Sequence, residues 1–414
     1  MRKINKIKIC SDHLCSSKFP LQHLALFIMC WIFAGYYFLE TSAHRALFYA
    51  GLLVFIPYIY KRQIWKILNF KHPAIILLVT YIGINFISVL WTSQVSLEDY
   101  FQNFKYGLFI VIFITALVTI LRDRPESIDY ITASLVISAI ITGLFLIAVN
   151  LNDIYKSLNS KFIFKLHGLG RGENPNIAAF LYSIPALILC FYNPKSASGP
   201  WQYLQNRIVK AFFLFIFIIL IILTLSRNGL LSLGLALLIL SVMTYNKKYL
   251  LTFLLIPVTL GTIHFFDHSL IEGLIARADS GRFDIWEDAY DLFIQAPFLG
   301  HGSIAEVTYY ARDVQHTSAH NIYMGHLNYL GMIGLIIFLS MSICFIYKAW
   351  IYNKKENDLL PFALLLHGGL WGCFEWHTFY LNLNPEWLSS WVPAAILITW
   401  FTEQSHQRPI QKTA

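Results

Sequence analysis

Three side chains in this sequence are of the types that can transfer a group away from a phosphate. Arg227 and Arg282 each follow a small residue, and His320 precedes an asparagine and a long apolar run. Two guanidinium groups can bind a diphosphate by bidentate hydrogen bonds and stabilise it as it leaves. A histidine, with an ordinary pKa near 6.5, can take a proton from an attacking hydroxyl. The three types together suit direct, inverting transfer of a glycosyl group from a lipid diphosphate, with no covalent nucleophile.

Each of these residues also has a simpler explanation. Arg227 lies between two apolar runs and could anchor a helix hairpin at a membrane surface. Arg282 could pair with Asp279 or Asp284, and His320 could cap the helix that follows it. Sequence spacing alone leaves both kinds of explanation open.

Other polar residues compete for supporting roles. Glu375 and His377, near the end of a late apolar run, are alternative bases, although packing or hydrogen bonding within the helix bundle is the favoured explanation. Arg171 lies in a glycine-rich turn, where it could assist phosphate binding or orient its loop. Gly331 and Gly334 lie three residues apart after His320, and this spacing predicts close helix packing.

The elements that must position these residues are apolar helices. The chain has 414 residues, of which 57% are hydrophobic and 13% charged, whereas soluble domains carry about 25% charged residues. Lipid cannot satisfy a bare backbone, so long apolar runs must form helices. We therefore predict an all-α integral membrane protein, a single polytopic domain over residues 1–414. The expected spans, about twelve, are 21–39, 45–60, 74–91, 106–121, 130–150, 177–193, 211–225, 229–245, 249–265, 322–347, 359–377 and 387–402.

Basic residues set the expected orientation. The net charge is +8, but Lys and Arg occur in small clusters between the apolar runs. If the N-terminus is cytoplasmic, most of them fall in cytoplasmic segments, as the positive-inside rule requires. Both termini are then cytoplasmic, and Arg227, Arg282 and His320 share the outer face. Scattered topology signals of this kind argue against nucleic-acid binding.

The cysteines indicate neither a disulfide framework nor a metal site. The six cysteines lie in the N-terminal tail or in apolar runs. Cys10, His13 and Cys15 belong to a basic tail, and the apolar run 21–39 is long for a signal peptide, so we expect it to be a retained span. No Asp-x-Asp motif for a divalent cation is present, and we expect no metal or other cofactor.

Two polar segments are expected on the outer side. One is 151–176, and the other is 266–321, which is long enough for a small subdomain between the ninth and tenth spans. The second segment contains an expected amphipathic helix that could lie in the membrane interface. Its apolar face comprises Ile285, Trp286, Ala289, Leu292 and Phe293, and its acidic face Asp284, Glu287, Asp288 and Asp291.

The strings around these residues resemble the O-antigen ligase and polymerase superfamily. The similar strings are Asn174-Pro-Asn176, Ser226-Arg-Asn-Gly229, Gly281-Arg282 with Trp286, Pro297-Phe-Leu-Gly-His-Gly302, and His320-Asn321-x-Tyr323 with Leu327, Gly331 and Gly334-Leu335. Each string is short, but they follow the family's order from about residue 174 to 335.

This resemblance implies a GT-C-like glycosyltransferase in the inner membrane of a Gram-negative bacterium, with its active site facing the periplasm. It would join undecaprenyl-diphosphate-linked O-antigen to the lipid A-core oligosaccharide in lipopolysaccharide biosynthesis. Carried over residue by residue, Arg227 and Arg282 would bind the donor diphosphate, and His320 would be the base or orient the acceptor. Asn321 shares the His-Asn string. His316 lies one helical turn before His320, and either histidine could enter the cleft.

Two alternatives remain at this point. An O-antigen polymerase would use the same donor with a different acceptor, and the length and the single dominant late loop favour the ligase. A lipid-linked sugar transporter could bind diphosphate with the same arginines without chemistry. A transporter would show paired broken helices or internal repeats, and neither is clear in the sequence.

Overall fold

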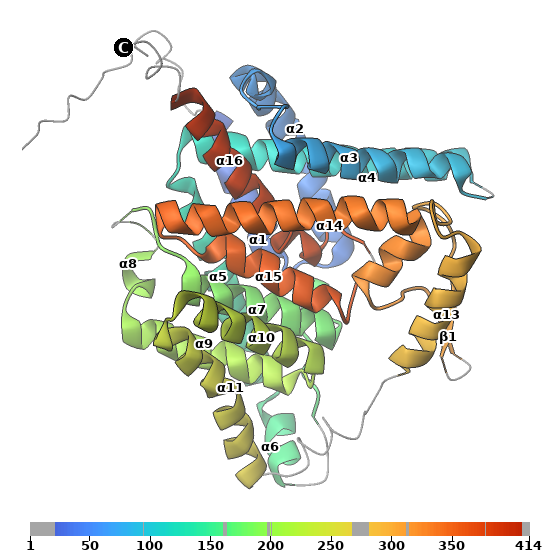
Figure 1. The fold of residues 1–414 in the computed structure, drawn as a ribbon. Coiled ribbons are helices and arrows are strands. Elements are labelled where there is room, and N and C mark those ends of the chain that lie inside the picture. Colours follow the sequence, from blue (N-terminus) through green and yellow to red (C-terminus); the bar gives the residue numbers. More distant parts are fainter. Residues whose placement is uncertain are drawn as a thin grey trace, which may run out of the picture.

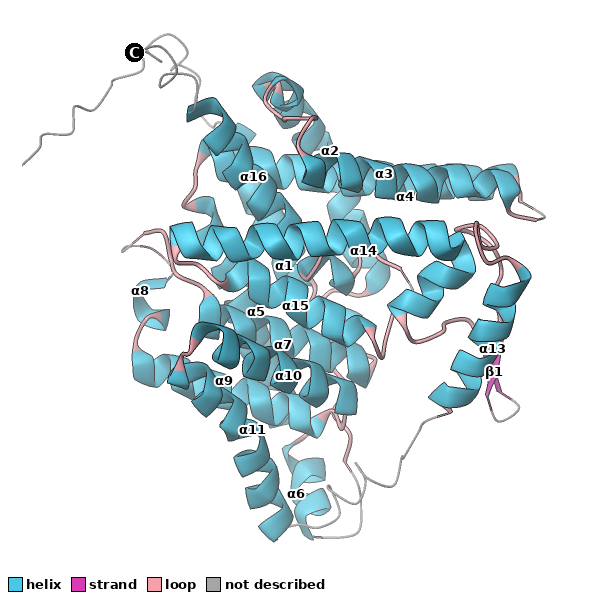
Figure 2. Ribbon diagram, in the orientation of Figure 1, coloured by secondary structure: helices cyan, strands magenta, loops and turns pink. Residues whose placement is uncertain are grey.

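The structure is a bundle of apolar helices (Figures 1 and 2). This computed structural model describes residues 21–407 except 94, 160–163, 197–198, 200, 267–280, 312–313 and 377, so Cys10, His13, Cys15, Asp279 and His377 lie outside the described residues. The main helices are α1 (Leu21–Gly35), α2 (Thr41–Arg62), α3 (Pro73–Ile87), α4 (Leu97–Asp123), α5 (Ser127–Val149), α6 (Leu151–Asn159), α7 (Pro175–Phe191), α8 (Trp201–Leu204), α9 (Arg207–Leu223), α10 (Arg227–Thr244), α11 (Lys247–Phe266), α13 (Arg282–Gln295), α14 (Ile322–Glu356), α15 (Leu360–Gly372) and α16 (Trp391–Gln407).

Every apolar run expected to span a membrane overlaps a helix in the structure. Among the described residues, six helices are long and apolar enough to cross a membrane: α2, α3 with its following 3-10 turn, α4, α5, α10 and α14. Large apolar side chains on the outer surface, such as Leu53 and Leu90, are 79% and 72% exposed. Exposed apolar surface of this kind suits a lipid environment. The prediction of an all-α membrane protein is confirmed at this level.

Two predicted spans are longer than the helices that replace them. The run 21–39 becomes α1, which ends at Gly35, where buried Tyr36 and Tyr37 begin a turn. The run 359–377 becomes α15, which ends at Gly372. Glu375 therefore lies in the turn after the helix, not within it. Apolar composition continues through both turns, so hydropathy cannot mark these ends.

Helix α14 is broken at Gly331. This residue has φ 65° and ψ −167°, and the backbone of the segment around Phe298 approaches it so closely that a Cβ would meet the Phe298 carbonyl carbon at 2.3 Å. The amides of Met332 and Ile333 donate to the carbonyls of Pro297 and Phe298. The glycine predicted to allow helix packing thus admits a loop backbone, and the break turns the first part of α14 toward α13.

The outer segments contain more structure than the sequence indicated. Helix α6 occupies the start of segment 151–176, and a short hairpin of β1 (Tyr309–Ala311) and β2 (Val314–His316) lies within 266–321, pairing Tyr309 with His316. The amphipathic helix is present as α13. Its buried side chains, Ile285 and Ala289, form a small separate cluster with the hairpin. Short strands give too little alternation to be recognised in a sequence this apolar.

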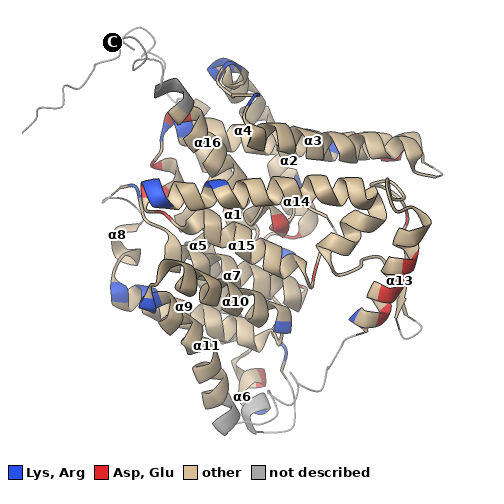
Figure 3. Cartoon of the chain, viewed as in Figure 1, with Lys and Arg blue, Asp and Glu red and all other residues tan. Residues whose placement is uncertain are grey.

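Charged residues lie at both ends of the bundle, and those within α13 are mostly acidic. Figure 3 shows Asp and Glu gathered along α13, whereas Lys and Arg lie around α8, α9 and the far end of α14. Hydrogen bonds join the start of α7, the start of α10, the segment before α14 and the turn after α15 into one region. This region is the end of the bundle that α13 covers (Figure 1).

Candidate active site

Arg227 is held by the tight turn between α9 and α10. Leu225 has φ 52°, and Ser226 caps α10 by accepting a hydrogen bond from the Gly229 amide at 3.3 Å. The Ser226 hydroxyl in turn donates to the Asn176 side chain at the start of α7 (3.0 Å). Two helix N-termini are thereby tied together, and Arg227 is the first residue of α10, as the predicted hairpin requires.

Arg282 begins α13 directly after Gly281, which has φ 71°. Its guanidinium donates to Asn228 Oδ1 at 3.2 Å and to Glu375 Oε2 at 3.4 Å. Burial lowers the pKa of Arg282, the Glu375 carboxylate opposes that shift, and the neighbouring Arg227 guanidinium adds to it. Two guanidinium groups thus lie near each other with one carboxylate, and the Asp284 pairing considered for Arg282 is replaced by the Glu375 pairing.

His320 lies in the turn before α14, with its backbone in the left-handed region at φ 46°. The ring donates from Nδ1 to Glu375 Oε1 at 2.8 Å, and the side chain is 31% exposed. His320 does not cap α14. Asn321 has that role, because its side-chain oxygen accepts from the amides of Tyr323 and Met324 at 3.0 and 3.1 Å.

Glu375 is the centre of this region. Its carboxylate accepts hydrogen bonds from His320 and Arg282, and also from the side-chain amides of Asn176 (3.2 Å) and Asn228 (3.3 Å). The side chain is only 12% exposed. The sequence favoured packing or hydrogen bonding within the bundle over a base role for Glu375, and the geometry makes it a hydrogen-bonding partner shared by Arg282 and His320. The sequence signal that could have identified Glu375 was its expected position at the same membrane face as two arginines.

A cavity of about 210 Å³ opens beside these residues. We call it the cationic cavity, and it is lined by Lys165, Asn176, Leu225, Arg227, Asn228, Arg282, Ile285, His316 and His320. The ring centroids of His316 and His320 are 6.1 Å apart, so both histidines reach it. Lys165 was not expected. Its segment is fixed by the Leu166 amide, which donates to the Leu223 carbonyl at 2.8 Å.

Arg171 does not line this cavity. Its side chain is buried and donates to Thr41 Oγ1 at 3.3 Å, to Asn384 Oδ1 at 3.1 Å and to the Leu383 carbonyl. The guanidinium thus ties its loop to α2 and to the segment before α16. Of the two roles open to Arg171, the contacts favour orienting the loop.

The fold and the site define a polytopic, helical membrane protein with a cationic cavity at one end. Residues 212–339 match the family model described as O-antigen ligase. An O-antigen ligase from Pseudomonas aeruginosa is 26% identical over 245 residues, which cover 58% of this chain and 58% of that relative. This part of the chain is therefore similar to the O-antigen ligase family, and the resemblance found in the sequence is confirmed. Arg227, Arg282 and His320 lie inside the matched region, and Lys165 and Glu375 lie outside it.

Proposed function

We propose that this protein is a membrane glycosyltransferase of lipopolysaccharide biosynthesis. It would transfer O-antigen from undecaprenyl diphosphate to the lipid A-core oligosaccharide. The observation that carries the proposal is the joining of Arg282 and His320 through Glu375, beside a cavity that Arg227 also lines. The groups that bind the leaving diphosphate and the base that deprotonates the acceptor must act in the same displacement. A shared carboxylate holds Arg282 and His320 in one arrangement for it.

The donor diphosphate fits the charge of the cationic cavity. Lys165, Arg227 and Arg282 line it, and Arg282 also pairs with the Glu375 carboxylate. A diphosphate diester carries one negative charge on each phosphate, so the cavity and the donor are complementary. When the glycosyl bond breaks, the diphosphate gains further charge, which the guanidiniums stabilise more strongly than in the bound donor.

His320 would act as the general base. Nδ1 donates to Glu375, so the neutral ring carries its lone pair on Nε2. The acceptor O–H bond would break with its proton passing to Nε2, while the oxygen forms a bond to the anomeric carbon. The bond from that carbon to the diphosphate breaks, and its electron pair leaves with the phosphate. One displacement inverts the anomeric configuration. Glu375 stabilises the imidazolium, as a carboxylate does in catalytic triads.

We further propose that the reaction needs no metal. Guanidiniums can supply the charge that a divalent cation supplies in other phosphate-transfer sites. This part of the proposal rests on the residue types lining the cavity, and it is tested directly by adding a chelator.

The twelve-span, GT-C-like layout in the bacterial inner membrane belongs to the same proposal. With the N-terminus cytoplasmic and twelve crossings, α7, α10 and α14 all begin outside and α15 ends outside. Each of these ends contributes to the site, which supports a periplasmic active site and cytoplasmic termini. Labelling of single cysteines at both ends with a membrane-impermeant reagent tests the topology.

The decisive experiment is transfer by purified protein in detergent. Undecaprenyl-diphosphate-linked oligosaccharide is offered with lipid A-core or with a second donor molecule as acceptor, each with and without EDTA. Product on lipid A-core with EDTA present is the expected result. Product only on the second donor would make the protein a polymerase, and loss of product in EDTA would overturn metal independence. Binding of the donor without any product would favour transport.

A further inference from the structure

The backbone at His320 is held in an unfavourable conformation. Its φ of 46° lies in the left-handed region, which is unfavourable for a residue other than glycine. Strained residues persist only where their surroundings hold them, and they gather at functional sites. The contacts around this turn therefore indicate what sets the direction of the His320 ring.

Two contacts hold the turn besides the bond to Glu375. The His320 amide donates to Ser318 Oγ at 3.1 Å. The indole N–H of Trp286 donates to the Ala319 carbonyl at 3.0 Å. Ala319 is fully buried and belongs to the small cluster of Ile285 and Ala289, so few other donors can reach this carbonyl.

Trp286 lies one turn after Arg282 on α13. The same helix therefore presents a guanidinium to the cationic cavity at its first residue and an indole to the His320 turn at its fifth. The Trp286 ring also contacts Phe283 edge-on, with centroids 5.7 Å apart. Arg282 and Trp286 lie on one helix, so α13 fixes how far the Arg282 guanidinium lies from the turn that carries His320.

We propose that Trp286 is a positioning residue for His320. Its indole N–H fixes the Ala319 carbonyl and with it the left-handed turn that points the imidazole toward Glu375 and the cavity. This inference rests on the proposed function for its kinetic consequence, although the placement of the ring can be measured without any turnover. Placement of the base is thereby tied to the helix that binds the leaving diphosphate.

The substitution that separates this role from packing is Trp286→Phe. Phenylalanine keeps an aromatic ring in the cluster and removes only the N–H, which leaves the buried Ala319 carbonyl without that partner. We expect kcat to fall about tenfold, which is the size of effect for one buried hydrogen bond. The donor KM should change less than about twofold, because the residues that bind the donor diphosphate are unchanged. The matched control is Trp91→Phe, which removes an indole bond to the Leu299 carbonyl (3.1 Å) away from the turn and should leave both constants unchanged.

A double-substitution cycle shows whether the effect passes through His320. In a His320→Ala background, Trp286→Phe should have no further effect on residual transfer. An equal loss in both backgrounds, or full activity of the single variant, would overturn the proposal.

A second readout is independent of turnover. Diethyl pyrocarbonate modifies accessible imidazole nitrogens, and mass spectrometry follows the rate at His320 alone. Released from its turn, His320 should react faster in Trp286→Phe than in wild type, even if no acceptor supports transfer. An unchanged rate in a folded variant contradicts the positioning role whatever the activity. Ser318→Ala, which removes the other contact to the turn, is the second variant if Trp286→Phe does not fold, and the same faster reaction is expected.

Discussion

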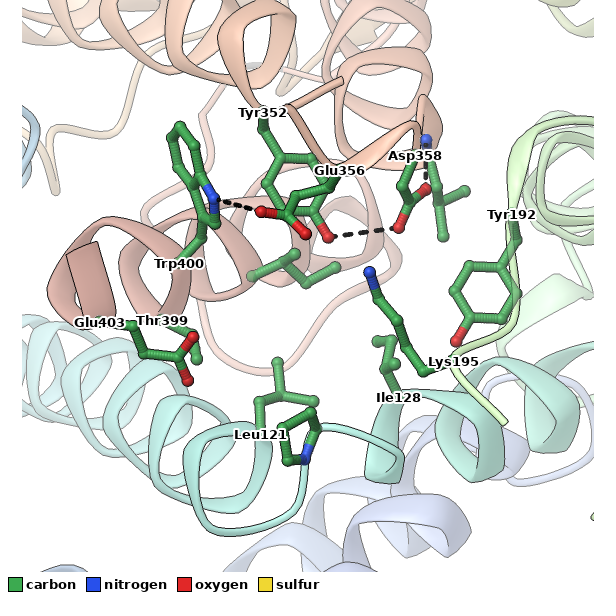
Figure 4. Close-up of a pocket in the computed structure, with 13 residues that line it drawn as sticks. Leu121, Ile128, Tyr192, Lys195, Tyr352, Glu356, Asp358, Thr399, Trp400 and Glu403 are labelled. Carbon is green, nitrogen blue, oxygen red and sulfur yellow. Dashed lines mark hydrogen bonds between the residues drawn. The ribbon is translucent and has the colours of Figure 1, made fainter. Parts of the chain in front are cut away.

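Two cavities of similar size lie at opposite ends of this bundle, and their charges are opposite. The cationic cavity, of about 210 Å³, lies beside α13. The other, of about 250 Å³, lies where α14 ends and α15 begins. We call it the acidic cavity, and it is lined by Leu121, Pro125, Ile128, Tyr192, Lys195, Tyr352, Glu356, Asp358, Leu360, Ile396, Thr399, Trp400 and Glu403 (Figure 4).

Two carboxylates of the acidic cavity accept hydrogen bonds from neighbouring helices. Asp358 accepts from the Tyr352 hydroxyl (3.3 Å) and from the Leu360 amide (3.1 Å), and Glu356 accepts from the Trp400 indole (3.0 Å). Figure 4 shows the Lys195 side chain reaching into the space between them, where its amine lies 5.8 Å from the Tyr352 ring centroid.

Cavity volume alone therefore does not distinguish a candidate binding site from a region where helices pack against one another. In the cationic cavity, three cations line the space, and Glu375, which pairs with Arg282, is not among the lining residues. In the acidic cavity, carboxylates outnumber the lysine and their bonds connect α14, α15 and α16. Of the two, only the cationic cavity has a lining charge that suits an anionic donor. Five substitutions test this division, from the largest expected effect to the smallest.

His320→Ala should produce the largest loss. Removing a general base lowers rates by about 10²–10⁴-fold, so kcat for transfer to lipid A-core should fall within that range while the donor still binds. The control is His23→Ala, on an exposed position of α1 at the other end. Wild-type turnover in a well-expressed His320→Ala protein would remove this histidine from the mechanism.

Arg227→Ala and Arg282→Ala should each lower kcat/KM by about 10²–10³-fold, as the loss of one charged transition-state contact does. The measurement is initial transfer rate against donor concentration. Arg207→Ala is the matched control, because Arg207 is the exposed first residue of α9 just as Arg227 is the first residue of α10. Equal losses in the control would mean that helix stability, not phosphate binding, is being measured.

Glu375→Gln should have a smaller effect, about 10- to 100-fold on kcat, because the amide keeps the shape but no longer stabilises an imidazolium. Donor KM should not rise, since removing the carboxylate that pairs with Arg282 leaves that guanidinium more available. Exposed Glu306→Gln serves as the comparison. A KM increase with unchanged kcat would assign Glu375 to donor binding instead of to the base.

The acidic cavity should affect stability and leave transfer unchanged. Burial raises the pKa of Asp358 to about 6. In the folded protein this carboxyl therefore holds its proton more strongly than in the unfolded chain, where the pKa is 3.8. The resulting stabilisation is fully present below pH 3.8 and is lost as the pH rises through about 6. The loss is up to roughly 3 kcal/mol for a shift of this size. Asp358→Asn should flatten the change in melting temperature between pH 4 and pH 7, with transfer at neutral pH kept near wild type.

Much of this protein could be predicted from residue types. The twelve apolar runs each became part of a helix, and Arg227, Arg282 and His320, predicted to share one face, line one cavity. Hydropathy and charge are local properties, so they locate helices and orient them without knowledge of their neighbours.

The central carboxylate and the third cation could not be derived in this way. Glu375 is 55 residues from His320 and 93 from Arg282 in the chain. Lys165 belongs to a loop, and a backbone bond to Leu223 holds its segment beside the cavity. Contacts between distant segments depend on how helices pack, and no local pattern carries that information.

By itself, the sequence determined the membrane class, the positions of the apolar helices and the residue types able to handle a diphosphate. It did so because each depends on side chains within one helix or one turn. The tertiary structure decided the rest: that α14 breaks at Gly331, that Arg171 ties a loop and does not line the cavity, and that Glu375 holds Arg282 and His320 together. A glycine only permits a break, and a buried charge only requires a partner. Which backbone fills the break, and which partner meets the charge, depends on the packing of the whole bundle.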